Sequence, residues 1–202
     1  MNEDLRSFLG FFSIFIIYIM GRDNNKLKDK VLSTTMRKPD FNRDYEIGKT
    51  SEEKSLADIK RIFYKDLELD ENPFSHFDYI SDKIKVELKT RDDIKFIDGK
   101  FIHPSGELES LYFDKVKLMN AINQNRCRIS LDEKPLRFYI CWKCSGEYFY
   151  WEILFKENGW LKNSEDLFTE YQNRDRGHGF KQPTQVINVK VDKIKKAPIT
   201  SL

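Results

Sequence analysis

Three charged residues near the middle of the chain have the types and spacing that metal-assisted hydrolysis requires. Glu87 follows Asp78 by nine residues, and Lys89 lies two residues further on. Carboxylates that face each other across paired strands lie about 5 Å apart at Cβ, and they repel unless a proton or cation joins them. Carboxylate oxygens suit Mg²⁺, while a lysine can orient or help deprotonate a water and offset phosphate charge. We therefore expect Asp78 and Glu87 to bind metal, with Lys89 beside them.

The proposed site depends on how two predicted strands pair. They precede and follow a tight turn predicted at residues 81–83. Side chains alternate along a strand, so Glu87 and Lys89 share one face. A two-residue turn, or a four-residue loop, places Asp78 opposite Glu87. A three-residue turn would put them on opposite faces unless a bulge restored the register.

A helix predicted before these strands carries a further acidic residue. Its apolar residues recur at helical intervals from Leu56 to Phe63, and Glu52 lies at the head of the same stripe. Glu52 is therefore expected to approach the two carboxylates. Thr50 and Glu53 have capping-box spacing, so the helix is predicted to begin beside them.

The order G-x-x-x-E on a helix, then an aspartate, then E-x-K on a strand resembles the PD-(D/E)XK nucleases. The likeness is greatest to archaeal-type Holliday-junction resolvases and to related phage and large-DNA-virus nucleases. Phe77 stands where the name-giving pattern has proline. The matching pieces cover under a quarter of the chain and are Gly48–Glu52, Phe77–Tyr79 and Glu87–Arg91.

The resemblance implies an α/β fold with a restriction-endonuclease-like central mixed β-sheet flanked by α-helices. It implies an endonuclease that hydrolyses DNA phosphodiester bonds, with branched or viral DNA as candidate substrates. The cofactor would be Mg²⁺, with Mn²⁺ able to substitute. Asp78 and Glu87 would hold the metal, Lys89 would position the water, and Glu52 would support the metal shell.

The resemblance also extends to substrate contacts and assembly. Arg91, at the end of the E-x-K strand, is a candidate phosphate contact. On the next predicted helix, Lys115 or Lys117 lies where such nucleases often carry a polar residue, and Lys115 is the chosen candidate. Many such nucleases act as dimers, so a homodimer is a candidate assembly.

Other interpretations of these residues stay open. Alone, Glu87 and Lys89 fit a solvated strand face bearing an ion pair, whereas adding Asp78 and Glu52 favours a site. The chain could instead be a catalytically inactive descendant of the nuclease fold with a structural or assembly role. A third alternative is a small membrane-anchored protein held by Phe8–Met20.

The composition indicates one domain with a sizeable core. The chain has 202 residues, of which 40% are hydrophobic and 14% aromatic. Its 35 basic and 33 acidic residues leave a net charge of +2, so any positive surface for DNA must be local, for example at residues 26–30 or 190–196. Three cysteines do not suggest a disulfide framework, which favours a reducing compartment: cytoplasm, or host cytoplasm for a viral protein. Cys141 and Cys144 are predicted to be buried thiols of one strand.

Residues 1–43 are assigned to an N-terminal apolar segment and polar tail, and residues 44–198 to the nuclease-like domain. The apolar run Phe8–Met20 is short for a bilayer span, which needs about 20 residues. It could be a membrane anchor, a segment packed on the domain, or a segment absent from the working protein. We favour the last interpretation because the rest of the chain needs no anchor.

The remaining elements are predicted from turn signals and periodicity, and they suggest a mixed α/β domain. They are a hairpin turning at Asp98–Gly99, a helix over Tyr112–Asn123, strands over Leu136–Trp142 and Tyr148–Phe155 joined at Ser145–Gly146, a short helix around Glu165–Tyr171, and a last strand over Thr184–Val191.

Overall fold

The computed structural model describes residues 41–72, 75–175 and 181–198. The chain divides into one unit ending at Arg37 and another spanning Lys38–Leu202, and the second contains everything described below. The apolar run Phe8–Met20 lies outside the described residues. Neither described helix is long and apolar enough to cross a membrane.

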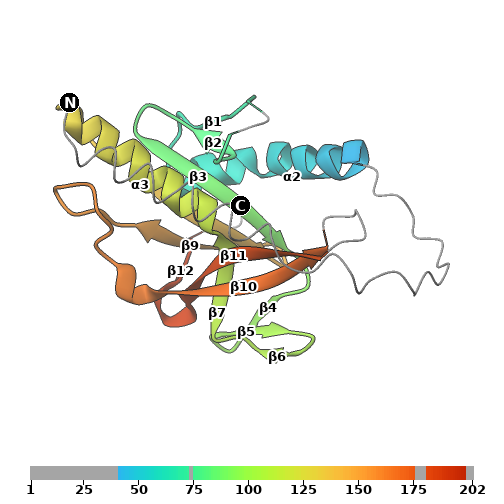
Figure 1. Ribbon diagram of the computed structural model, residues 1–202. Coiled ribbons are helices and arrows are strands. Elements are labelled where there is room, and N and C mark those ends of the chain that lie inside the picture. Colours follow the sequence, from blue (N-terminus) through green and yellow to red (C-terminus); the bar gives the residue numbers. More distant parts are fainter. Residues whose placement is uncertain (1–40, 73–74, 176–180, 199–202) are drawn as a thin grey trace, which may run out of the picture. The chain divides into compact units, whose positions relative to one another are not determined.

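The main element of the fold is a six-stranded mixed β-sheet (Figure 1). Its two central strands, β3 and β8, are parallel, and all other neighbours are antiparallel. In spatial order the strands are β1 (Glu68–Leu69), β2 (Tyr79–Ile80), β3 (Ile84–Arg91), β8 (Arg137–Cys144), β9 (Glu147–Ile153) and β12 (Lys195–Lys196).

Each face of this sheet is covered by one long helix. Alternation along β3 turns Val86 and Leu88 to a cluster that includes Ile59 of α2 (Phe41–Ile62). On the other face, Ile140 of β8 packs in a cluster with Ala121 of α3 (Lys115–Ser130). The domain is therefore a mixed α/β fold, as the sequence predicts.

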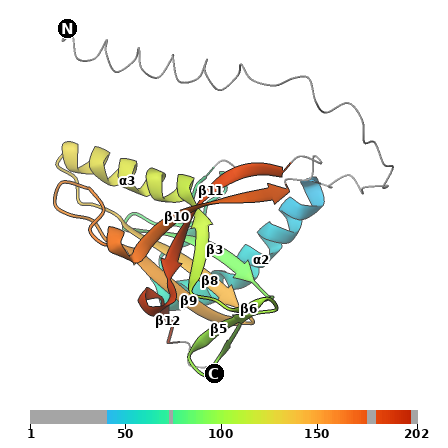
Figure 2. The ribbon, with the colours of Figure 1, turned by 60° about the horizontal axis from the view of Figure 1, so that its bottom comes forward.

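A second, three-stranded sheet lies on the α3 side. Figure 2 shows β10 and β11 beside β7, and buried residues of β7 and β11 join the same cluster as α3. A small sheet of short strands makes up the rest. The remaining bounds are β4 (Lys95–Ile97), β5 (Lys100–His103), β6 (Gly106–Glu107), β7 (Ser110–Asp114), β10 (Leu167–Asp175), β11 (Lys181–Lys190), and 3-10 turns at Ser164–Asp166 and Val191–Lys193.

The predicted hairpins are confirmed. Asp98 and Gly99 both have positive φ, 50° and 80°, which suits a two-residue turn. Ser145 and Gly146 repeat this geometry between β8 and β9. The strands on either side of the turn before β3 pair in the register predicted for a two-residue turn or a four-residue loop, since Tyr79 pairs with Val86.

Three predicted elements differ from the structure. Helix α2 begins at Phe41, so Thr50 lies within it instead of capping it, and the helix crosses the domain boundary predicted at residue 44. Pro39 precedes this helix, and within it Gly48 costs only about 1 kcal/mol relative to alanine. Propensity therefore allows the longer helix.

The other two differences concern strands. Residues predicted as the first turn of a helix at Tyr112 instead belong to β7, whose pairing with β11 overrides the helical spacing, and α3 runs on to Ser130. The helix predicted around Glu165–Tyr171 is a single 3-10 turn followed by β10. The helix prediction was wrong because it rested on the local sequence pattern, whereas every residue of β10 pairs with β11.

Candidate active site

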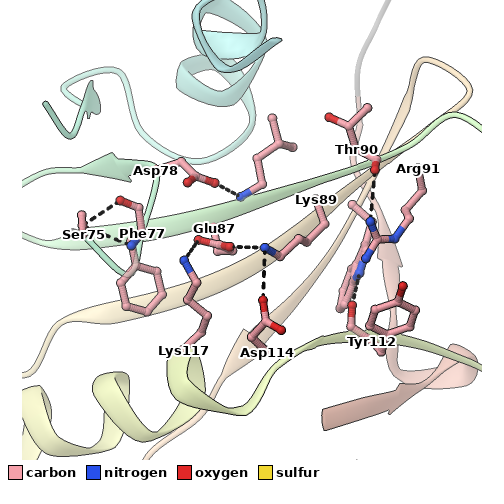
Figure 3. Close-up of polar contacts among 12 residues, drawn as sticks. Ser75, Phe77, Asp78, Glu87, Lys89, Thr90, Arg91, Tyr112, Asp114 and Lys117 are labelled. Carbon is pink, nitrogen blue, oxygen red and sulfur yellow. Dashed lines mark hydrogen bonds and ion pairs between the residues drawn. The ribbon is translucent and has the colours of Figure 1, made fainter. Parts of the chain in front are cut away.

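Glu87 is the buried centre of a charged cluster on the α3 face of β3. It is only 1% exposed. Its Oε1 lies 2.5 Å from Lys89 Nζ, and its Oε2 accepts a hydrogen bond from Lys117 Nζ at 2.8 Å (Figure 3). A buried carboxylate is costly unless it is paired and hydrogen-bonded. The two ammonium groups supply that pairing.

Lys89 links this carboxylate to a second one. Its Nζ is 3.8 Å from Asp114 Oδ2, at the end of β7 (Figure 3). Burial lowers the pKa of Lys89, but the charge and hydrogen bond of Glu87 outweigh burial, and the net pKa is raised. Lys89 is therefore an ammonium ion at neutral pH, suited to donate and to neutralise negative charge.

Asp78 lies at the edge of β3, where a bulge interrupts the pairing of β2 with β3. Its amide donates to the carbonyl of Val86 at 3.1 Å, although Val86 already pairs with Tyr79. Its Oδ2 accepts from the backbone amide of Leu88 at 2.7 Å. The carboxylate thus follows the strand edge instead of facing Glu87 directly, and Figure 3 shows the two on either side of the β3 ribbon.

The acidic groups are nevertheless close enough to influence each other. Burial and then the charges of Glu87 and Glu52 raise the pKa of Asp78 to about 7, against its usual 3.8. The Leu88 amide and Lys89 oppose this rise only in part. Asp78 therefore keeps its proton to a much higher pH than an ordinary aspartate, a state typical of clustered carboxylates that lack a cation.

Glu52 approaches from α2, as the helical stripe predicts. The phenolic hydroxyl of Tyr79 donates to the backbone carbonyl of Glu52 at 2.8 Å, which ties this turn of α2 to β2. Burial and the charge of Glu87 raise the pKa of Glu52, while Lys89 lowers it. The Glu52 side chain, on α2, therefore interacts electrostatically with the same charged cluster.

The structure tests which lysine of α3 reaches the cluster. Lys115 Nζ donates to Gln185 Oε1 of β11 at 2.8 Å, whereas Lys117 binds Glu87. Lys117, the other lysine named in the prediction, contacts the predicted site, and the chosen Lys115 does not. Arg91 lies over the ring of Tyr112, with 4.7 Å between the guanidinium carbon and the ring centroid.

Asp114 is a charged residue of the cluster that no sequence pattern predicts. It ends β7, a strand that the helical spacing of the following residues conceals. Only the pairing of β7 with β11 brings it beside Lys89. In contrast, the two cysteines of the C-x-x-C are buried as predicted and lie in separate clusters on opposite faces of the sheet.

Among the residues that the structure describes, no group of three or more His, Cys, Asp or Glu side chains is arranged to hold a metal ion. The chemistry of the donors nevertheless fits Mg²⁺ at Asp78 and Glu87. Burial, together with repulsion between the acidic groups, raises the pKa values of Glu52 and Asp78, and Mg²⁺ usually takes only one or two protein carboxylates. To reach Glu87, the metal must displace Lys89 or Lys117 from an oxygen.

The fold and site together define a mixed α/β protein with a cluster of acidic groups and lysines around β3, a central strand of its main sheet. No protein-family model matches the chain, and no curated protein matches it significantly.

Proposed function

We propose that this protein is a Mg²⁺-dependent endonuclease of the restriction-endonuclease-like fold that hydrolyses DNA phosphodiester bonds. The observation that supports this most strongly is Glu87, a buried carboxylate with an ammonium group on each oxygen, whose charge helps burial to raise the pKa of Asp78, across strand β3, to about 7. A surface ion pair would not require burial or a second lysine. A metal-assisted phosphate site uses both kinds of charge, carboxylates for the metal and lysines for the phosphate.

In the proposed reaction, each residue has one role. Asp78 and Glu87 would hold the metal, and Glu52 would support it from α2. The bound metal supplies charge stabilisation and a more acidic water. Lys89, kept as an ammonium ion by Glu87, positions the water or a phosphate oxygen and offsets charge that develops there. Lys117, which donates to Glu87 Oε2, would be free to contact the phosphate if a metal took that oxygen.

The test is the nicking of supercoiled plasmid and the cutting of branched and single-stranded DNA, in Mg²⁺, Mn²⁺ or EDTA. We expect metal-dependent cutting that falls by at least about 100-fold in Glu87→Gln and Lys89→Ala. The matched controls are Glu107→Gln and Lys100→Ala. These residues form an exposed ion pair of 2.8 Å on β5 and β6, and their loss should leave cutting unchanged.

A second candidate function is a catalytically inactive scaffold of the same fold with a structural or assembly role. The observation that favours it is the occupation of both Glu87 oxygens by lysines, which replaces a metal with protein charges. On this alternative, wild-type protein cuts no DNA substrate in either metal. Isothermal titration would also give the same result for wild type and Glu87→Gln, because no Mg²⁺ or Mn²⁺ would bind at Glu87.

A further inference from the structure

A pocket of about 340 Å³ lies at the turn end of the strand face that carries Glu87. It opens between the β2–β3 turn, the second half of α3 and the residue that precedes β8. Its lining combines two cationic side chains with a carboxylate, a hydroxyl and an amide, over a surface that is mostly apolar. The lining residues are Ser81, Asp82, Lys85, Gln124, Cys127, Arg128 and Leu136.

Lys85 is the central charge of this pocket. It lies two residues before Glu87 on β3 and points to the same face. It is partly buried, and within the described part of the chain no hydrogen bond or ion pair engages its ammonium group. A partly buried ammonium that no carboxylate contacts directly is a cost to the folded protein, which a bound anion would offset.

Arg128 provides a second cation at the pocket. Its Nε donates to the carbonyl of Lys134 at 2.7 Å, and one terminal nitrogen lies 3.0 Å from Glu133. These contacts fix the guanidinium, which has five N–H donors and keeps others for a ligand. The carboxylate in the lining, Asp82, is 72% exposed and lies 4.0 Å from Lys83, so it can turn to solvent.

We propose that this pocket binds a backbone phosphate of the DNA substrate, with Lys85 as its main contact and Arg128 as its second. This inference rests on the proposed function, because it places the pocket on the path of a strand that reaches Glu87. Strand residues rise about 3.3 Å each, so Lys85 lies about 7 Å from Glu87 and 13 Å from Lys89. The bound phosphate would therefore be a near neighbour, along the same strand, of the phosphate that is cut.

The pocket gives the protein a contact that carries no sequence information. A lysine that neutralises one phosphate contributes about one unit to the slope of log affinity against log salt. It would fix the register of the strand over the cluster without selecting a base. The same contact suits the nearly neutral chain, which must gather its positive charge locally.

The experiment measures binding of fluorescein-labelled duplex and branched DNA by anisotropy, in EDTA, over a series of salt concentrations. Lys85→Ala should weaken binding several-fold and lower the salt slope by about one, and Lys85→Arg should restore both. The matched control is Lys83→Ala. Lys83 lies in the β2–β3 turn, two residues before Lys85. Its Nζ donates to the hydroxyl of Tyr64, which packs against the hydrophobic cluster that includes Ile59. Melting of Lys85→Ala checks the fold, and its stability should equal or exceed that of wild type.

Each outcome separates the pocket from the active site. Equal affinity and slope in Lys85→Ala and Lys83→Ala overturn the phosphate pocket, even if the wild type cuts DNA. DNA binding that depends on Lys85, without any DNA cutting, supports the phosphate pocket and contradicts the proposed endonuclease function. Wild-type protein that binds no DNA overturns the pocket as well as the nuclease. Binding of a polyglutamate peptide in place of DNA, lost in Lys85→Ala, would also overturn it and assign the pocket to an acidic protein partner.

Discussion

At the scale of single residues, Glu87 decides the electrostatics of the cluster. Its two oxygens hold Lys89 from its own strand and Lys117 from α3, so the metal-free site is already partly neutralised. A cation must therefore compete with two lysines for one carboxylate. We expect metal binding to be weak until a substrate phosphate provides further oxygen ligands and attracts the displaced lysine.

The pKa of Asp78 makes a prediction about stability against pH. The folded-state pKa of about 7 lies above the ordinary 3.8, so the folded protein binds the proton more tightly than the unfolded chain. In EDTA, the free energy of unfolding should fall as pH rises from about 4 to 7, by an amount on the order of 1 to 4 kcal/mol. Urea unfolding at each pH measures it.

Asp78→Asn is the variant that isolates this group. Asparagine does not titrate, so this part of the pH dependence should disappear while the amide of Leu88 keeps an oxygen acceptor. Asp82→Asn, an exposed change in the neighbouring turn, should retain the wild-type profile. The same loss of stability with pH in Asp78→Asn as in wild type would contradict the assignment.

At the scale of elements, the site depends on how α3 is fixed to the main sheet. Asn125 is fully buried and bridges α3 to the chain before β8. Its Nδ2 donates to the carbonyl of Leu136 at 2.9 Å, and its Oδ1 accepts from the amide of Leu136 at 2.8 Å. These two bonds hold the helix that carries Lys117.

Asn125→Ala should therefore be strongly destabilising. It leaves a buried amide and a buried carbonyl of Leu136 without partners, at about 1 to 3 kcal/mol each. Thermal and urea unfolding would measure the loss. Asn123→Ala, an exposed change on the same helix, should shift stability by less than about 0.5 kcal/mol. Equal effects of the two changes would show that the bridge is unimportant.

At the scale of the whole molecule, the cluster joins three segments that are distant in the sequence. Glu52 comes from α2, Asp78 to Lys89 from the β2–β3 hairpin, and Asp114 with Lys117 from the junction of β7 and α3. A ligand that binds this cluster must therefore stabilise the folded domain as a whole, since the unfolded chain does not hold these groups together.

Mg²⁺ should accordingly raise the melting temperature. At ten times its Kd, a ligand of the folded state adds about 1.4 kcal/mol, which corresponds to about 3 to 6 °C for a domain of this size. Differential scanning fluorimetry at constant ionic strength would detect this shift. The gain should vanish in Glu87→Gln and persist in Glu107→Gln, and an equal gain in both variants would assign the effect to the surface.

The sequence by itself determined the features that depend on neighbours along the chain. Alternation placed Glu87 and Lys89 on one face of β3, and positive-φ turn residues defined the hairpins at Asp98–Gly99 and Ser145–Gly146. Helical spacing turned Glu52 toward the sheet. These properties follow from backbone periodicity and local sterics, which a short window of sequence contains.

Only the tertiary structure decided which distant groups meet. The bulge at Asp78, the choice of Lys117 over Lys115 and the arrival of Asp114 depend on strand pairing and helix docking between segments that are far apart in sequence. The strands β7 and β10 became strands for the same reason, because pairing with β11 outweighed their local preferences. Long-range pairing adds backbone hydrogen bonds and burial that no local pattern encodes.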